Sequence, residues 1–166
     1  MKFYADMPQA YDIAFYASQP MDSDMEKQLL APLREALVGK TELESANILL
    51  HFVQTAFEYK TDHNQFGVER YFYKEELFYY PYSDCEDRAI LFSHIIRKLM
   101  GLDVVILLYP NHASTAVKFR SEIAGDYVMV NGEKYVVCDP TYINANVGKS
   151  QPDYVGVKPE VQIIKM

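Results

Sequence analysis

Tryptophan is absent from this sequence of 166 residues, cysteine occurs only twice, and basic residues are in deficit. The 16 Lys and Arg against 23 Asp and Glu give a net charge of −7. A nucleic-acid surface needs a basic face to meet phosphates, so we expect no nucleic-acid partner. Two cysteines build no disulfide framework. Because no apolar run approaches the roughly 20 residues that span a bilayer, we expect no membrane insertion either.

Targeting and linker signals are also missing. Residues 1–20 carry Asp6 and Asp12 and have no continuous apolar stretch, which argues against a secretory signal peptide. The sequence shows no low-complexity tract, internal repeat or linker rich in Pro, Gly and Ser. A chain of this length fits one domain. We therefore expect a single domain over residues 1–166, and the compartment stays open at this point.

The first half of the sequence carries helix signals. Ser23-Asp24-Met25-Glu26 has the pattern of a capping box and predicts a helix that runs to about Val38. Thr41-Glu42-Leu43-Glu44 has the same pattern and precedes a helix with one apolar stripe. Residues 1–20 look irregular. Residues 60–82 have no clear period and many aromatics, which predicts a long ordered loop of the kind that often has a function.

The second half begins with one more helix and then changes to strands. Ser83-Asp84-Cys85-Glu86 opens a helix that is apolar on more than one side and ends at Gly101, so we expect it to be central. Asn131-Gly132 is a strong hairpin signal between two apolar runs. The predicted strands are residues 104–109, 114–119, 127–130 and 134–138, with an edge strand at 161–164. Helices followed by antiparallel strands indicate the α+β class.

Cys85 is the first candidate for chemistry. It stands in the first turn of the predicted central helix, where backbone N–H groups are unpaired and the helix dipole is positive. Such a position can lower the pKa of a thiol and hold an oxyanion. A lone cysteine is more often a small buried hydrophobe, but a polar helix cap is not where a core residue is expected. We therefore expect Cys85 to be a nucleophile.

His112 and Asp139 complete a triad. His112 stands at the mouth of a predicted strand, and Asp139 ends the hairpin that follows. An imidazole near neutral pKa can take the thiol proton, and a carboxylate on its other nitrogen fixes the tautomer. Each residue alone has a simpler reading, as a loop histidine and a turn aspartate. Together with Cys85 they predict nucleophilic catalysis.

The neighbours of these residues have structural readings. Cys138 precedes Asp139 on a strand, so it faces the other way and belongs to the core. A Cys85–Cys138 disulfide stays an alternative that the spacing does not demand. Acidic residues in a first helical turn stabilise the dipole, and we interpret Glu86 and Asp87 in this way. They would oppose ionisation of the thiol unless they point away or pair with Arg88.

The motifs Asp84-Cys85-Glu86-Asp87-Arg88-Ala89, Asn111-His112-Ala113 and Val137-Cys138-Asp139-Pro140-Thr141-Tyr142 resemble the transglutaminase-like superfamily, in its bacterial form. The resemblance covers about residues 42–148. It implies a papain-like fold, in which a helix bearing the cysteine packs on an antiparallel sheet that supplies His and Asp. It also implies Cys85, His112 and Asp139 as a catalytic triad for acyl transfer through a thioester.

The resemblance implies a peptide or protein substrate. Domains of this kind are often parts of larger exported proteins, so it also implies export and further domains if this chain is a piece of a longer protein. Otherwise we expect the protein in the cytoplasm. The sequence departs from the animal cross-linking enzymes, which have Gly-Gln-Cys-Trp and a Trp near the oxyanion. One of Tyr79, Tyr80 or Tyr82 is a candidate substitute for that Trp. Cross-linking is not implied, and we expect a cysteine peptidase or amidase more than an amine transferase.

Two other interpretations compete. The chain could be a binding module for peptides or cell wall that keeps the fold, with the aromatic loop at 66–82 as its surface. Alternatively, Cys, His and Asp could be zinc ligands. No CxxC or HxxxH pair is present, so we expect neither a metal nor a cofactor.

Overall fold

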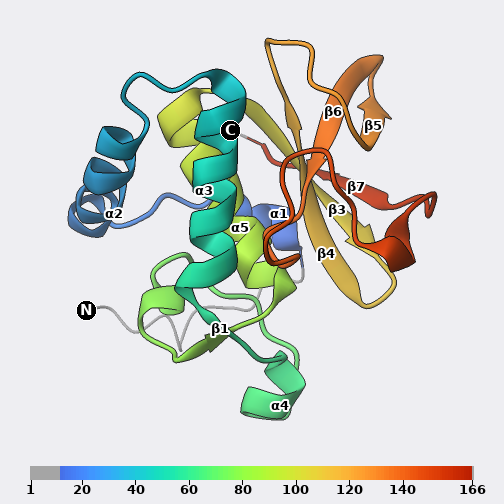
Figure 1. Ribbon diagram of the computed structural model, residues 1–166. Helices are drawn as coiled ribbons and strands as arrows, with labels where there is room; N and C mark the ends of the chain where they lie inside the picture. The colour runs from blue at the N-terminus through green and yellow to red at the C-terminus, as the bar shows by residue number, and fades with distance from the viewer. Residues whose placement is uncertain (1–11, 166) are drawn as a thin grey trace.

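Helices come first along the chain and an antiparallel sheet follows (Figure 1). The computed structural model describes residues 12–165. Its helices are α1 (Ile13–Ser18), α2 (Ser23–Ala36), α3 (Glu42–Ala56), α4 (Asp62–Phe66) and α5 (Cys85–Met100), with 3-10 turns η2 (Glu76–Phe78) and η3 (Pro152–Tyr154). None of the helices in this range is long and apolar enough to cross a bilayer.

The helix caps agree with the sequence in one case and differ by one residue in two. Thr41 and Glu44 form the predicted capping box of α3. The N-cap of α2 is Asp22 instead of Ser23, because the Asp22 carboxylate accepts from the backbone of the first turn. At α5 the N-cap is Asp84, whose box partner is Asp87. This shift makes Cys85 the first residue of α5.

The strands of the main sheet are β3 (Asp103–Tyr109), β4 (His112–Lys118), β5 (Tyr127–Val130), β6 (Glu133–Cys138) and β7 (Glu160–Ile163), and they lie in the order β5-β6-β4-β3-β7. All neighbouring pairs are antiparallel. The Asn131-Gly132 hairpin is confirmed, since Val130 pairs with Glu133 and both turn residues have positive φ. The edge strand β7 is confirmed close to its predicted position.

The core lies between α5 and the sheet. Helix α5 packs on β3 and β4 with one side and on α3 with another, which explains why its sequence is apolar nearly all round (Figure 1). Cys138 is fully buried in this core, and both cysteines are free, so the disulfide alternative is wrong for this structure. The opposite face of the sheet has a smaller apolar cluster, formed by Val105, Leu107, Ala116 and Val137.

Two predicted irregular segments contain regular structure. Within residues 1–20, α1 buries Ile13, Tyr16 and Ala17, while residues 1–11 lie outside the described part. The predicted loop at 60–82 contains α4 and η2, and it is flanked by a two-residue parallel pair, β1 (Glu58–Tyr59) and β2 (Tyr82–Ser83). Several of its aromatics point inward, since Phe72 and Tyr73 are buried. They are core residues, and this weakens the idea of the loop as a binding surface.

Candidate functional site

Cys85 begins α5 at the end of the sheet where β4 starts. The Asp84 and Asp87 side chains each accept from the other's backbone N–H at 3.3 Å, which fixes the start of the helix and the direction of Cys85. The Cys85 Sγ accepts from the backbone N–H of Ala113 at 3.4 Å. The thiol therefore lies beside the backbone of the residue that follows His112, and it is buried.

A tight turn between β3 and β4 places His112 next to Cys85. Tyr109 pairs with His112 across the β3–β4 hairpin, so Pro110 and Asn111 alone form the loop. Asn111 has a φ of 59°, a left-handed conformation that asparagine tolerates better than most residues. Proline followed by a left-handed residue is typical of a type II turn. His112 is consequently the first residue of β4, at the end of the sheet.

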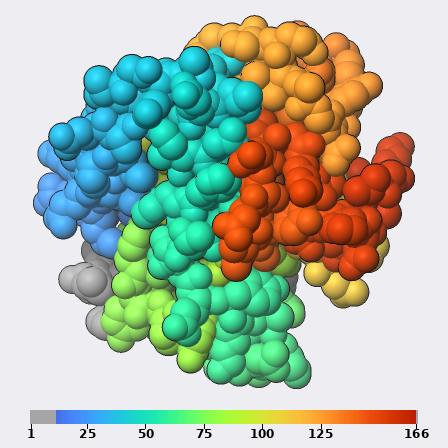
Figure 2. All heavy atoms as spheres, in the orientation of Figure 1, coloured from blue at the N-terminus to red at the C-terminus, as the bar shows by residue number. Residues whose placement is uncertain are grey.

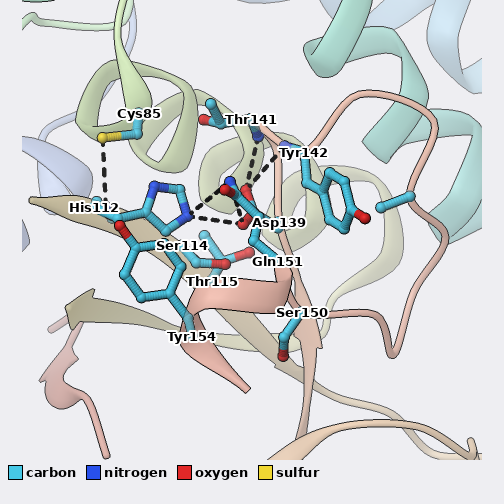
Figure 3. Close-up of polar contacts among 12 residues, drawn as sticks. Cys85, His112, Ser114, Thr115, Asp139, Thr141, Tyr142, Ser150, Gln151 and Tyr154 are labelled. Atoms are coloured by element: carbon cyan, nitrogen blue, oxygen red, sulfur yellow. Dashed lines mark hydrogen bonds and ion pairs between the residues drawn. The ribbon is translucent and has the colours of Figure 1, made fainter. Parts of the chain in front are cut away.

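Asp139 reaches the same end from β6. Thr115 pairs with Cys138, and extending this register by one residue sets Asp139 opposite Ser114, on the face that His112 shares. The Asp139 Oδ2 lies 2.7 Å from His112 Nε2. Figure 3 shows the second ring nitrogen of His112 on the side that faces Cys85. His112 and Asp139 are thus in direct contact, and Cys85 lies beside them, with its Sγ bonded to Ala113 N–H and Glu86.

The Asp139 carboxylate is held from several directions. Its Oδ1 accepts from the backbone N–H groups of Thr141 at 2.9 Å and Tyr142 at 3.1 Å (Figure 3). The buried Gln54 of α3 donates to the Asp139 carbonyl oxygen at 3.0 Å. Figure 2 shows the segment after β6, in orange-red, lying against α3, in teal. Helix α3 therefore fixes the loop that carries the carboxylate.

Two further residues touch the site from the segment after this loop. Gln151 Nε2 donates to Asp139 Oδ2 at 3.1 Å, and the Tyr154 ring stacks on His112 with 4.8 Å between centroids. Gln151, Tyr154 and Gln54 are not predicted from the sequence as site residues. No local pattern marks them, because each reaches His112 or Asp139 only through the packing of a distant segment.

Glu86 differs from its expected role. Its carboxylate accepts from the Cys85 thiol at 2.9 Å, so it points at the nucleophile. Arg88 does not pair with it, since the buried guanidinium donates to Ser83 Oγ and to backbone carbonyls of α3 and the residue after it. Burial, and next the Glu86 carboxylate, raise the pKa of Cys85. This direction is opposite to the expectation from the helix N-terminus, because desolvation outweighs the dipole.

An acidic cluster adjoins the thiol. Asp62, Glu69 and Asp84 each direct a carboxylate oxygen to one place, with these atoms within 4.8 Å of one another. Within residues 12–165 this is the one such group with the geometry to hold a metal ion, and an all-oxygen set suits a hard divalent cation. From the sequence we expect no metal in this protein. Burial and neighbouring carboxylates raise the pKa of Asp62 to about 6 and that of Asp84 to about 8.

These raised pKa values predict a loss of stability with rising pH. A carboxyl group that binds its proton more tightly in the folded state stabilises the fold at low pH and destabilises it as pH rises towards its folded pKa. Between pH about 6.5 and 8, Asp84 still titrates in the folded state. His94, whose pKa burial lowers to about 4, is already neutral there, so it adds only the upper part of its titration in the unfolded chain, a smaller effect of opposite sign. We expect the thermal unfolding midpoint to fall over this range by a few degrees, in buffer with a chelator.

Asp84→Asn is the matched variant for this prediction. Asparagine keeps the N-cap acceptor of α5 and removes the charge. We expect this variant to be more stable than wild type at pH about 8 and to show a flatter dependence of the midpoint on pH. Equal slopes for the two proteins would show that Asp84 does not govern the effect.

Tyr59 is a further phenol close to the nucleophile. Tyr59 pairs with Ser83 in the β1–β2 ladder, and Ser83 stands two residues before Cys85 in the sequence. Burial and the charges of Cys85 and Asp84 raise the pKa of Tyr59. Tyr59 is therefore a further tyrosine whose phenol lies beside the Cys85 thiol.

Comparison with known proteins gives one informative likeness. No protein-family model and no curated protein matches the sequence. Among solved structures, "Legionella pneumophila LapG (EGTA-treated)" superposes with a TM-score of 0.54 at 17% sequence identity, over 93% of this chain and 84% of that chain. The two chains share a fold. At this identity the likeness extends to the fold alone.

Proposed function

We propose that this chain is a thiol-dependent enzyme of papain-like, transglutaminase-like fold that acts on peptide or isopeptide amides through Cys85, His112 and Asp139. The observation that carries the proposal is the 2.7 Å contact between His112 and Asp139 next to a thiol that accepts from Ala113 N–H. The shared fold with LapG supports the fold part of the proposal. A single domain that meets a peptide or protein substrate is part of the same proposal.

The proposed reaction begins with a neutral thiol. His112 Nδ1 takes the Cys85 proton as the sulfur attacks the substrate carbonyl carbon, because the Nε2–H is engaged by Asp139. The oxyanion of the tetrahedral intermediate accepts hydrogen bonds from backbone N–H groups of the first turn of α5. His112 then gives its proton to the leaving amine, and the C–N bond breaks to leave a thioester. Water, deprotonated by His112, attacks the thioester carbonyl. The C–S bond breaks, the acid product leaves, and His112 returns the proton to the Cys85 sulfur; an amine in place of water would give transfer.

A peptide-binding module is the second candidate, and the state of Cys85 favours it. The thiol is buried and its pKa is raised, whereas reactive cysteines are usually partly exposed with lowered pKa values. In that reading, the triad residues would hold the fold without turnover. The two readings differ in whether Cys85 is needed for a chemical product.

The test is product formation by wild type and Cys85→Ala on a mixture of unfolded proteins and isopeptide-linked peptides, followed by mass spectrometry. We expect cleavage by wild type and none by Cys85→Ala, with a primary amine added to detect transfer. Cys138→Ala is the matched control, because Cys138 is fully buried in the core and should be dispensable for chemistry. Peptide binding without any product from wild type would support the module instead.

A further inference from the structure

The segment 149–156, here called the return segment, brings two side chains to the triad. Gln151 Nε2 lies 3.1 Å from Asp139 Oδ2 and 3.3 Å from His112 Nε2. The amide N–H₂ donates to Asp139 Oδ2, the oxygen that accepts from His112 Nε2–H, and so holds this acceptor in place; with Nε2 protonated, the Gln151 amide makes no hydrogen bond to the ring itself. The remaining ring nitrogen is then an acceptor on the side of Cys85 (Figure 3).

Tyr154 holds the plane of the imidazole. The two rings are nearly parallel, at an interplanar angle of 16° with 4.8 Å between centroids. The Tyr109 ring also stacks on His112, with 6.2 Å between ring centroids, and it contacts the Tyr154 ring, with 5.0 Å between centroids. The Tyr154 hydroxyl donates to the carbonyl oxygen of Pro110 at 3.3 Å, which ties the ring to the turn that delivers His112. Rotation of the imidazole about χ2 would break this stack.

At its start the return segment is anchored by Ser150 N–H, which donates to Asp126 Oδ2 at 3.0 Å. Beyond Ser150 its tip is exposed, and the backbone bonds of η3 are internal, from Tyr154 N–H to the Gln151 carbonyl and from Val155 N–H to that of Pro152. Tyr154 also lines an open cavity of about 460 Å³ together with Tyr109 and residues of β5. Core packing therefore does not fix Tyr154, and its contacts with His112 and the turn are what position it.

We infer that Gln151 and Tyr154 are positioning residues of the acyl-transfer site, which fix the tautomer and the plane of His112. The inference rests on the proposed function. It identifies the return segment as part of the site, although neither residue touches the reacting sulfur. A ring that is free to turn would present its accepting nitrogen to Cys85 for only part of the time.

The experiment measures the rate of Cys85 alkylation by iodoacetamide against pH, in a Cys138→Ala background, for Gln151→Leu, Tyr154→Leu and Tyr154→Phe. We expect each leucine variant to lose about tenfold or more of the His112-dependent rate, since small misplacements of catalytic groups are costly. Tyr154→Phe keeps the stacked ring and should stay close to wild type. Nitrogen NMR of His112 should show a growing share of the other tautomer in the leucine variants only.

Tyr127→Leu is the matched control, because Tyr127 lines the same cavity while its ring lies against Lys134. Thermal midpoints equal to wild type exclude loss of folding as the cause. Leucine variants that react like wild type, while His112→Ala is slow, would overturn the inference and leave the proposed function standing. A wild-type rate that is indifferent to His112→Ala would overturn the proposed function itself.

Discussion

His112→Ala is expected to slow alkylation of Cys85 at neutral pH by about 100-fold or more, the usual contribution of a positioned general base. The reason lies in the resting thiol. Burial and the Glu86 carboxylate raise the pKa of Cys85, so almost no free thiolate exists near pH 7. Reactivity at this pH therefore requires His112 to remove the proton as the sulfur attacks. The measurement is the rate constant over pH 5 to 10, in the Cys138→Ala background.

The control for this prediction is His63→Ala, an exposed histidine of α4 that is remote from the triad in sequence. It should leave the profile unchanged. If both histidine variants and wild type react only above pH about 8 with the same rate, the thiol is unactivated. The binding-module interpretation would then replace the enzyme.

The state of the Cys85 thiol differs from that expected from the sequence. A helix N-terminus favours the thiolate, and the sequence therefore predicted a lowered thiol pKa. In the structure the thiol of Cys85 donates to Glu86, and burial raises its pKa. Sequence could show that a carboxylate follows the cysteine, but the direction of a side chain depends on its rotamer and on the packing around it.

The parts of the fold that the sequence predicted are those with local causes. Thr41 with Glu44, and Asn131 with Gly132, form their structures from interactions within a few residues. The proximity of Cys85, His112 and Asp139 was predictable because all three stand at the ends of their elements; their catalytic role stays a prediction. Helix α1, with only six residues, was missed, since such a short helix is stable only through its buried contacts.

The same distinction explains the missing site residues. Gln54 and Gln151 lie on either side of Asp139 in the sequence, 85 and 12 residues away. Nothing in their neighbourhood marks a polar function, and glutamine is common on exposed surfaces. Only the packing of α3 against the loop after β6, and the return of residues 149–156, reveals that both donate to the same aspartate.

Asp139→Asn is expected to lower kcat/KM by about 10³- to 10⁴-fold with the fold retained, as the equivalent change does in serine triads. The asparagine Oδ1 can keep the two bonds from Thr141 and Tyr142 N–H, so the loop should hold its shape. Its Nδ2 donors, however, would face His112 Nε2 and Gln151 Nε2. His112 must then offer Nε2 as an acceptor and carry its proton on Nδ1, facing the thiol that it should deprotonate. Turnover and His112 nitrogen shifts would be measured together, with Asp103→Asn as the matched control, because Asp103 is exposed and lies at the end of β3 away from the β3–β4 turn. Full activity of Asp139→Asn with an unchanged tautomer would contradict the assigned role of Asp139.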